Sequence, residues 1–509
     1  MMGFIGFRNK LSCHQSLTII TVLAIAAFLV VEIWDGDIWW QVAIGRHILS
    51  NGVVPQTDLF TAAGFDRPYH DSHWLFQVVM ALADKVWGMN GVQIVMIALW
   101  GVIFFVCYKS IHDWIDSSPA LPVLFLVSIA CSGRFTPRPD LVSFLMVSVF
   151  YFRLQKGRFR TLADQLLLVF MQVLWNNSHG LFVLGPFMVG CYFLSAFISS
   201  GWQLNKDLRR LGGLFLAVIL ATALTPLGIE VWSYAYLLFK EGGLNTDVFF
   251  SGIEELKSPF NARSLRYPDV WIFILLLGAF IGTLFVAGFR RILDYGRLLI
   301  VLVFALLAVK SLRSIPYFAL TAAPFMAELF SKLGIKLRIR TPAAILTCTA
   351  MALIAVFPVS GMYYRYMTIQ PRFGLGVAKD VFPEGLPRFL NEISFKGNFY
   401  NAADLGGFCL YHGFTPLFDT RWEVYLPDLL RPLWTAPDDQ PLWEAMVNHY
   451  HLEGLLLKNG SRVSNSLVPR LIADPAWKLV YIDRVATFWL RNSQTWEHVL
   501  DLRYKKREQ

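Results

Sequence analysis

The chain has 509 residues, of which 55% are hydrophobic, 15% aromatic and 16% charged. This composition is too apolar for a soluble multidomain protein and indicates a polytopic membrane protein. The formal net charge of +9 does not point to a nucleic-acid partner, because the basic residues fall in short loops between apolar segments. Of the six cysteines, only Cys409 lies in a polar region, so a framework of structural disulfides is not expected.

Long apolar segments recur along the chain. The first, residues 16–34, can cross the hydrocarbon core at about 1.5 Å per residue, and Arg8 and Lys10 precede it. No small-residue cleavage pattern follows it, so we expect it to be retained as an anchor. We predict about eleven transmembrane helices, several of them short for a full span. The segments are residues 16–34, 91–111, 119–132, 140–154, 165–176, 180–198, 211–225, 269–289, 296–309, 315–330 and 342–361.

Basic residues collect in alternate loops, as the positive-inside rule requires of cytoplasmic loops. A cytoplasmic N-terminus then places three long segments on the extracytoplasmic face: a first outer loop of residues 35–90, a second long outer loop of residues 226–268, and everything after residue 361. In the first outer loop, residues 38–49 and 73–87 have apolar residues at helical spacing, which predicts two helices lying along the membrane surface. The basic clusters lie at residues 156–160, 206–210, 290–297 and 332–340.

The composition changes after residue 361, where prolines, aspartates and short apolar runs replace the long hydrophobic segments. The predicted fold is therefore an α-helical polytopic membrane module over residues 1–361, followed by a small extracytoplasmic α/β domain over residues 362–509. Strands are expected at residues 398–402, 408–411, 417–419, 454–458, 478–482 and 486–490, and helices at residues 387–393 and 441–449.

Two aspartates, Asp35 and Asp37, follow the first apolar segment directly, in the sequence DGDIWW. Carboxylates just beyond a membrane helix can act as a general base, orient a hydroxyl or amine, or bind a divalent cation. The alternative is helix capping, because either side chain can accept hydrogen bonds from the free N–H groups of the next helix. The pattern leaves both roles open, and one aspartate can cap while the other takes part in chemistry.

Two polar motifs carry histidines on the same face. In RPYHDSHW, His70, Asp71 and His73 can bind a metal, relay a proton or contact a polar substrate, and Asp71 or Ser72 can instead cap the following helix. In WNNSHG, Asn177 and His179 can hydrogen-bond sugar hydroxyls, hold the first outer loop, or simply form a tight turn.

Cations on the extracytoplasmic face are exceptions to the positive-inside trend and make anion binding worth testing. Arg134 and Arg138 lie between prolines in the turn GRFTPRPD, and guanidinium groups offer forked donors that match phosphate oxygens. The alternatives are lipid headgroup contact and a salt bridge to Asp140. The same reasoning applies to Lys310 and Arg313.

Other charged residues receive weaker interpretations. Glu255 and its neighbour in the second outer loop are further carboxylate candidates or part of a solvated edge. In DTRWEVY, Asp419, Arg421 and Glu423 alternate as on a strand and can share one face, which favours an internal ion pair over a catalytic role. The sequence has no Walker loop, paired CxxC or HExxH motif, and its short basic loops offer no nucleotide-sugar site. Any donor used on the outer face is therefore expected to be membrane-borne.

Several motifs together carry a family resemblance: DGDIWWQVAIGRHIL, TDLFTAAGFDRPYHDSHWLFQ, the RPD turn, WNNSHG followed by LFVLGP, and LTPLG at residues 224–228. With these motifs the chain resembles bacterial membrane glycosyltransferases of the C superfamily (GT-C), which use polyprenyl-phosphate-linked sugars. These enzymes are related in architecture to protein mannosyltransferases and aminoarabinose transferases. The resemblance implies a multi-pass protein of the bacterial inner (cytoplasmic) membrane, with a polyprenyl-phosphate-linked sugar donor and the lipid bilayer as partners and an acceptor that the sequence does not identify.

The resemblance also assigns roles. An acidic residue early in the first outer loop is implicated in catalysis, which points to Asp37 or Asp35, with Asp37 preferred. It would activate the acceptor while cationic groups stabilise the departing phosphate. A divalent cation stays open as a cofactor. The remaining candidates are expected to bind substrate: His70, Asp71, His73, Arg134, Arg138, Asn177, His179, Lys310 and Arg313.

Two other classes of function remain. A transporter or flippase of lipid-linked saccharides would also have many helices and outer-face cations, but it would normally carry ionisable groups near the bilayer centre. A non-catalytic envelope-assembly protein would use its terminal domain to bind a partner, yet the polar motifs lie mostly outside that domain. The apolar segments of this chain contain few ionisable groups, with Arg153 and Glu32 close to segment ends. This scarcity and the position of the polar motifs both favour an enzyme.

Overall fold

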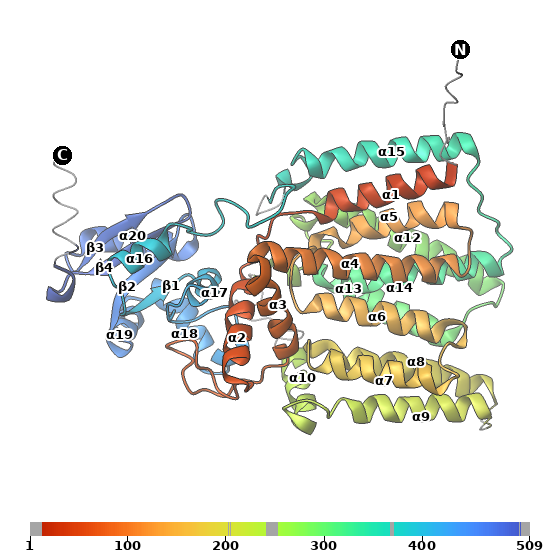
Figure 1. The fold of residues 1–509 in the computed structure, drawn as a ribbon, viewed down its shortest axis with the longest axis horizontal. Helices are drawn as coiled ribbons and strands as arrows, with labels where there is room; N and C mark the ends of the chain where they lie inside the picture. The colour runs from red at the N-terminus through yellow and green to blue at the C-terminus, as the bar shows by residue number, and fades with distance from the viewer. Residues whose placement is uncertain are drawn as a thin grey trace, which may run out of the picture.

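The computed structural model describes residues 13–201, 203, 205–240, 253–366, 371–497 and 499. Arg8 and Lys10, which the topology prediction used, lie outside these residues. Figure 1 shows a bundle of long, nearly parallel helices and, beside it, a smaller part that carries a four-stranded sheet. Two helices, α2 (Asp37–Asn51) and α3 (Trp74–Trp87), lie between the bundle and the sheet.

Each of the eleven predicted apolar segments coincides with a helix of the bundle. The helices are α1 (Cys13–Leu29), α4 (Met89–His112), α5 (Ser117–Cys131), α6 (Asp140–Leu154), α7 (Leu162–Asn176), α8 (Leu184–Ser199), α9 (Lys206–Ala221), α12 (Pro268–Phe289), α13 (Tyr295–Lys310), α14 (Ile315–Lys332) and α15 (Thr341–Val359). Within the described residues, five helical stretches are long and apolar enough to cross a membrane by length and composition. They are Met89–His112, Ser117–Arg134, Gly180–Ser199, Pro268–Phe289 and Thr341–Val359.

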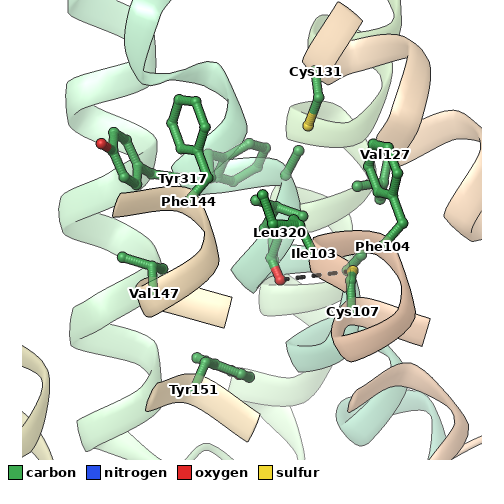
Figure 2. Close-up of a cluster of buried hydrophobic side chains, with 14 of the residues drawn as sticks. Ile103, Phe104, Cys107, Val127, Cys131, Phe144, Val147, Tyr151, Tyr317 and Leu320 are labelled. Carbon is green, nitrogen blue, oxygen red and sulfur yellow. Dashed lines mark hydrogen bonds between the residues drawn. The ribbon is translucent and has the colours of Figure 1, made fainter. Parts of the chain in front are cut away.

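The core of the bundle forms around α14. Every residue from Ile315 to Leu329 is buried, and all of them except Thr321 and Glu328 are apolar. Figure 2 shows side chains of four helices meeting at this core, where the Cys107 thiol lies 4.0 Å from the carbonyl oxygen of Leu320. The labelled side chains come from α4 (Ile103, Phe104, Cys107), α5 (Val127, Cys131), α6 (Phe144, Val147, Tyr151) and α14 (Tyr317, Leu320).

The predicted basic loops meet at one end of the bundle, as the contact of Arg160 with Asp207 and that of Lys332 with the Ile292 carbonyl show. At the end away from the sheet, Arg158 pairs with Asp113 at 2.6 Å, and Arg297 pairs with Glu328. The guanidinium of Arg297 also lies 5.8 Å from the ring of Trp114, which joins these pairs into one region. We call this the basic end, because the predicted basic loops meet there, and the opposite end, where α2 and α3 lie, the α2 end.

The two helices predicted in the first outer loop are confirmed as α2 and α3. Figure 1 shows that both cross the bundle helices at a steep angle, which suits helices at a membrane surface. They pack closely because Gly45 of α2 faces the backbone of α3. A Cβ atom at this position would overlap the carbonyl oxygen of Gln77 and approach the Ala81 side chain to 2.9 Å.

Gly45→Ala is therefore expected to lower the stability of the protein by about 1–3 kcal/mol, the usual cost of overpacking. The matched control is Gly101→Ala, because nothing lies within 4 Å of a Cβ atom there and alanine favours a helix. Thermal unfolding of both variants in one detergent tests the prediction. Equal midpoints for the two variants would show that α2 and α3 are free to move apart.

The sheet has the strand order β1-β2-β4-β3. Strand β1 pairs with β2 in parallel, and the other two pairings are antiparallel. The strands are β1 (Asn398–Asn401), β2 (Leu452–Lys458), β3 (Trp477–Ile482) and β4 (Ala486–Arg491). The accompanying helices are α16 (Leu386–Glu392), α17 (Ala403–Tyr411), α18 (Leu430–Thr435), α19 (Gln440–His449) and α20 (Arg462–Ala473). Four predicted strands and both predicted helices of this region are thereby confirmed.

Two predicted strands are wrong. Residues 408–411 form the end of α17, whose apolar face packs on α2, and a short apolar run does not distinguish a buried strand from a buried helix. Residues 417–419 run beside β1 without joining the sheet, because a side chain takes up their backbone groups. The Asn401 amide accepts from the Leu417 N–H at 2.9 Å and donates to the Phe418 carbonyl at 2.8 Å.

The helix α2 shares its hydrophobic contacts with the residues around the sheet. The Trp39 ring lies 5.2 Å from that of Phe382 and 5.1 Å from that of Phe408. Ile38 and Val42 belong to the same buried cluster as the sheet residues Leu456 and Phe488, so α2 is held on both sides. This packing fixes where the first residues of α2 lie.

Candidate functional site

Asp35 and Asp37 meet different partners although only one residue separates them. Asp35 is 2% exposed, accepts a hydrogen bond from the Asp37 N–H at 2.9 Å, and pairs with Arg138 through its other oxygen. Asp35 thus binds the first residue of α2, while Gly36 occupies the N-cap position. Gly36 between them allows a close approach, because a Cβ atom there would lie 2.8 Å from the carbonyl oxygen of Asp404 in α17.

The carboxylate of Asp37 lies at the start of α2, where it is held but still reachable. One oxygen accepts from the hydroxyl of Thr420 at 2.5 Å, and the other lies 3.1 Å from Arg138. The side chain keeps 22% of its exposure, against 2% for Asp35. Of the two aspartates, Asp37 is the one that a substrate can reach.

Arg138 is the centre of the site. Its guanidinium binds three carboxylates: Asp35, Asp37 at 3.1 Å, and Glu255 at 2.9 Å. The turn that carries it is stiffened by a proline on each side, since proline fixes the backbone angle φ. Asp35, Asp37 and Glu255 come from two outer loops, so Arg138 joins parts of the chain that are far apart in sequence.

Glu255 gathers the other cations. Arg134 pairs with Glu255 and with Asp140, which confirms the salt bridge that the sequence offers as an alternative for Arg134. Arg313 lies 3.9 Å from Glu255. Burial alone would raise the pKa of Glu255, but Arg138, Arg134 and Arg313 hold it well below its ordinary value. We refer to Asp35, Asp37, Arg134, Arg138, Asp140, Glu255 and Arg313 as the carboxylate–arginine cluster.

The cluster has four carboxylates and three guanidinium groups. Burial and the neighbouring carboxylates raise the pKa of one carboxylate of the cluster, Asp37. Burial raises the pKa of Asp37 to about 6, with further contributions from the charges of Asp35 and Glu255, while Arg138 and the Thr420 hydroxyl oppose the shift. A carboxylate that titrates near 6 can accept a proton from a hydroxyl at neutral pH more readily than an ordinary aspartate. The site thus provides a candidate general base.

Removing the hydroxyl of Thr420 is expected to change this pKa. A hydrogen bond to a carboxylate stabilises its charged form, so Thr420→Val raises the pKa of Asp37 above about 6 by about 1 unit. The pH at which turnover reaches half its maximum then moves upward by the same amount. Thr420→Ser keeps the donor and serves as the control. An unchanged pH profile in Thr420→Val would contradict the role given to this contact.

Two histidines lie next to the cluster. The rings of His73 and His179 are 5.7 Å apart, and the Nδ1 atom of His179 lies 2.6 Å from the Ser143 hydroxyl. Burial lowers the pKa of His73 to about 4 and that of His179 well below its ordinary value, and Arg313 adds to both shifts. Both imidazoles are therefore neutral at physiological pH and can exchange hydrogen bonds with a polar ligand.

Asp71 lies just before α3, whose N-cap residue is His73. One of its oxygens accepts from the His73 N–H and from the Gln77 amide, both at 3.0 Å. The ring of His70 lies 5.7 Å from that of Tyr234. Within the described parts of the chain, no three His, Cys, Asp or Glu side chains form a group that could hold a metal ion.

Asn177 holds the first outer loop in place. It accepts from the Trp74 indole N–H at 2.8 Å and donates to the Leu224 carbonyl at 2.8 Å. This connects α3 with the LTPLG element. Lys310 is exposed at the end of α13, whereas Arg313, three residues later, faces Glu255.

The motif DTR joins the C-terminal part to the first outer loop. The side chain of Arg421 is fully buried and pairs with Asp58 at 2.8 Å and with Asp419 at 2.7 Å, which confirms the predicted internal ion pair. The expected strand alternation is wrong, because the chain makes a short 3-10 helix from Trp422 to Tyr425. Thr420 lies between the paired residues and is thereby brought to Asp37.

Sequence reasoning missed Thr420 and the central place of Glu255. Thr420 is 383 positions from Asp37, and no spacing signal connects them. The charges of the DTR motif predict an ion pair, but nothing in the motif indicates a contact of its hydroxyl group. Glu255 was detectable as a carboxylate in an outer loop, but its three arginine partners become visible only in the folded chain.

No protein-family model matches the sequence, and no curated protein matches it. Solved structures do match. The oligosaccharyltransferase of Archaeoglobus fulgidus in the apo form is 12% identical with a TM-score of 0.58, and the match covers 89% of this chain and 70% of that one. ArnT from Cupriavidus metallidurans bound to undecaprenyl phosphate is 12% identical with a TM-score of 0.52, and the match covers 94% and 98%. The chain therefore has the fold of these two proteins, as the resemblance noted in the sequence predicts.

Proposed function

We propose that the protein is a membrane glycosyltransferase that moves a sugar from a polyprenyl-phosphate-linked donor to an acceptor on the extracytoplasmic face. The observation that carries the proposal is the reachable carboxylate of Asp37, with a pKa of about 6, beside three arginines at one end of the bundle. The matched ArnT structure holds undecaprenyl phosphate, which supports this class of donor.

The proposed orientation follows from the charges at the two ends. The basic loops meet at the basic end, which the positive-inside rule places in the cytoplasm. All eleven bundle helices would then span the membrane, with the N-terminus cytoplasmic, and the α2 end and residues 362–509 outside. In bacteria this corresponds to a multi-pass protein of the inner membrane. The division of the chain near residue 361, into a membrane module and a C-terminal domain, is part of the same proposal.

The proposed chemistry is a single displacement. The acceptor hydroxyl oxygen bonds to the anomeric carbon, the bond from that carbon to the phosphate oxygen breaks, and polyprenyl phosphate leaves with the electron pair. The proton of the hydroxyl passes to Asp37. Neutral His73 and His179 are positioned to hydrogen-bond sugar hydroxyls beside the cluster.

The cations differ in how firmly carboxylates already hold them, and therefore in how easily each can bind the phosphate. Arg134 and Arg138 are each held by two or more carboxylates. Arg313 is 35% exposed and lies 3.9 Å from Glu255. Of the three arginines it can therefore turn toward an incoming phosphate with the smallest loss of ion-pair contacts. Lys310 is exposed nearby and can add to the attraction.

The sequence leaves a divalent cation open as a cofactor. The carboxylates of the cluster are already bound to guanidinium groups, and a cation would have to displace them to gain oxygen ligands. This donor set does not suit a metal site, and the proposed transfer contains no metal step.

Reconstituted protein incubated with a panel of polyprenyl-phosphate sugars tests the proposal. The expected result is consumption of at least one donor, with release of polyprenyl phosphate and formation of a new glycosidic bond. Mass spectrometry detects all three changes. Movement of the lipid-linked sugar across vesicles without a new bond would support a transporter instead. Against a transporter stands the position of the pairs Arg138–Asp35 and Arg297–Glu328, which lie at the two ends of the bundle.

A further inference from the structure

One carboxylate of the carboxylate–arginine cluster contacts three guanidinium groups at once. Glu255 lies in the second outer loop and uses both of its oxygens. Its Oε2 atom accepts from Arg134 and Arg138, and its Oε1 atom lies 3.1 Å from Arg138 and 3.9 Å from Arg313. Burial opposes the charge of Glu255, but these arginines hold its pKa well below its ordinary value, so it is an anion at physiological pH. A single anion thus occupies the place where three arginines converge.

Two of these arginines also have partners that are more deeply buried than Glu255. Arg134 pairs with Asp140 and Arg138 pairs with Asp35, and the side chains of the two aspartates are only 4% and 2% exposed. The side chain of Glu255 is 22% exposed. Arg134 and Arg138 can therefore keep their positions when the Glu255 side chain turns away.

The backbone around Glu255 is held independently of its side chain. The Glu255 carbonyl accepts from the Ser311 hydroxyl at 2.9 Å, and the Lys257 carbonyl accepts from the Leu312 N–H at 3.0 Å. These contacts fix the segment beside Arg313, whose only ion-pair partner among the described residues is Glu255. A rotation of the Glu255 side chain toward solvent therefore removes one anionic partner from three guanidinium groups without moving the backbone.

The position of the Glu255 carboxylate suits a phosphate ester. A carboxylate and a phosphodiester each carry one negative charge shared by two oxygens, and guanidinium groups bind both with forked hydrogen bonds. Exchanging one for the other leaves the charge of the cluster unchanged. Arg138 contacts Glu255 through Nη1 and lies 3.1 Å from Asp37 through Nη2. A phosphate in place of the Glu255 carboxylate would therefore lie beside the candidate base.

We propose that the Glu255 carboxylate occupies the subsite of the donor phosphate, between Arg134, Arg138 and Arg313, and competes with that phosphate for the arginines. The proposal deepens the proposed function and rests on it for the identity of the ligand, a polyprenyl phosphate ester. Binding of the phosphate does not itself require sugar transfer. Glu255 then sets the affinity for the donor, because a charged phosphate must displace the carboxylate and an uncharged lipid of the same chain does not.

Isothermal titration calorimetry of undecaprenyl phosphate with the purified full-length protein, in detergent without divalent cations, tests the competition. Glu255→Gln is expected to bind this lipid about tenfold more tightly than the wild type. That is the gain from removing a competing state that holds the subsite about nine-tenths of the time. Undecaprenol, which has the same chain and no phosphate, should show no gain. Glu254→Gln is the matched control, because Glu254 pairs with Lys257 and Arg263 instead of the three arginines.

Three results would overturn the proposal. Equal or weaker binding of undecaprenyl phosphate in Glu255→Gln would mean that Glu255 is indifferent to the phosphate or assists it. An equal gain in Glu254→Gln would mean that the effect follows from the net charge of the loop. A gain for phosphatidylglycerol, without one for undecaprenyl phosphate, would assign the arginines to bilayer headgroups.

A second measurement uses the wild type and does not depend on the folding of a variant. In a cryo-electron microscopy structure with undecaprenyl phosphate, the phosphate is expected between the three arginines, with the Glu255 side chain turned away from Arg138. Glu255 still bound to Arg138, with the phosphate elsewhere, would contradict the competition. Thermal unfolding of Glu255→Gln and Glu254→Gln shows that both variants are folded when the titrations are compared.

Donor turnover, measured on the same preparations, separates this proposal from the proposed function. If the wild type consumes no polyprenyl-phosphate sugar and Glu255→Gln still binds undecaprenyl phosphate more tightly, the transferase proposal fails and the phosphate subsite stands. If the wild type transfers a sugar and Glu255→Gln gains no affinity, the competition fails alone.

Discussion

Asp37→Asn is expected to lower the turnover of the lipid-linked donor by about 100-fold or more, the usual contribution of a general base. Asparagine can still accept the hydrogen bond from Thr420, and the change removes a partly buried carboxylate whose pKa is raised to about 6. The folded protein should therefore lose little stability. The measurement is donor consumption at saturating donor, together with thermal unfolding of the same sample.

The pH dependence gives a second readout of the same variant. The base must be unprotonated to accept a proton, so wild-type turnover is expected to rise with pH through about 6, the pKa of Asp37, and to fall away below it. The residual activity of Asp37→Asn should not show this step. Asp66→Asn is the matched control, because Asp66 is exposed in the same loop and its φ of 60° suits asparagine. Full activity in Asp37→Asn with loss in Asp35→Asn would exchange the roles of the two aspartates.

Arg138→Gln is expected to have the largest effect on stability among the site variants. It leaves Asp35, Asp37 and Glu255 without the guanidinium that joins them. Breaking a buried ion pair by removing one partner costs about 3–5 kcal/mol, although the 24% exposure of Arg138 reduces this figure. The pKa of Asp37 should also rise further above about 6, because Arg138 is the main group that opposes its shift.

A double variant tests the coupling. Glu255→Gln, added to Arg138→Gln, removes one of the carboxylates left without a partner, and part of the lost stability should return. Activity should not return, because the arginine that orients Asp37 is still absent. Arg138→Lys keeps the charge but not the forked geometry, so it is expected to be intermediate in thermal unfolding. An unfolding midpoint in Arg138→Gln equal to that of the wild type would show that the cluster does not hold the three segments together.

Some of the site was accessible from local sequence. Asp35 and Asp37 stand out because two carboxylates directly after a long apolar segment must lie at a membrane surface. Arg138 stands out because cations are unusual on the face opposite the basic loops. These inferences need only residue order and the energetics of charge near a membrane.

The relations between these residues were not accessible. The sequence marks Glu255 as a carboxylate candidate, but it contains no sign of the contacts with Arg134, Arg138 and Arg313. Thr420 carries no local signal of a contact with Asp37. Residues 408–411 are helical because they pack on the apolar surface of α2. The secondary-structure preference of four residues carries no information about such a distant partner.

By itself the sequence determined the helical bundle, the two helices of the first outer loop, most of the sheet and the separation of basic loops from polar motifs. These features depend on the period of apolar residues and on the cost of moving charge into a membrane, and both are read from neighbouring positions. Only the tertiary structure decided which carboxylate stays reachable and which arginines are already paired. Those properties depend on burial and on contacts between segments hundreds of residues apart, because the pKa and reach of a side chain are set by whatever the fold places around it.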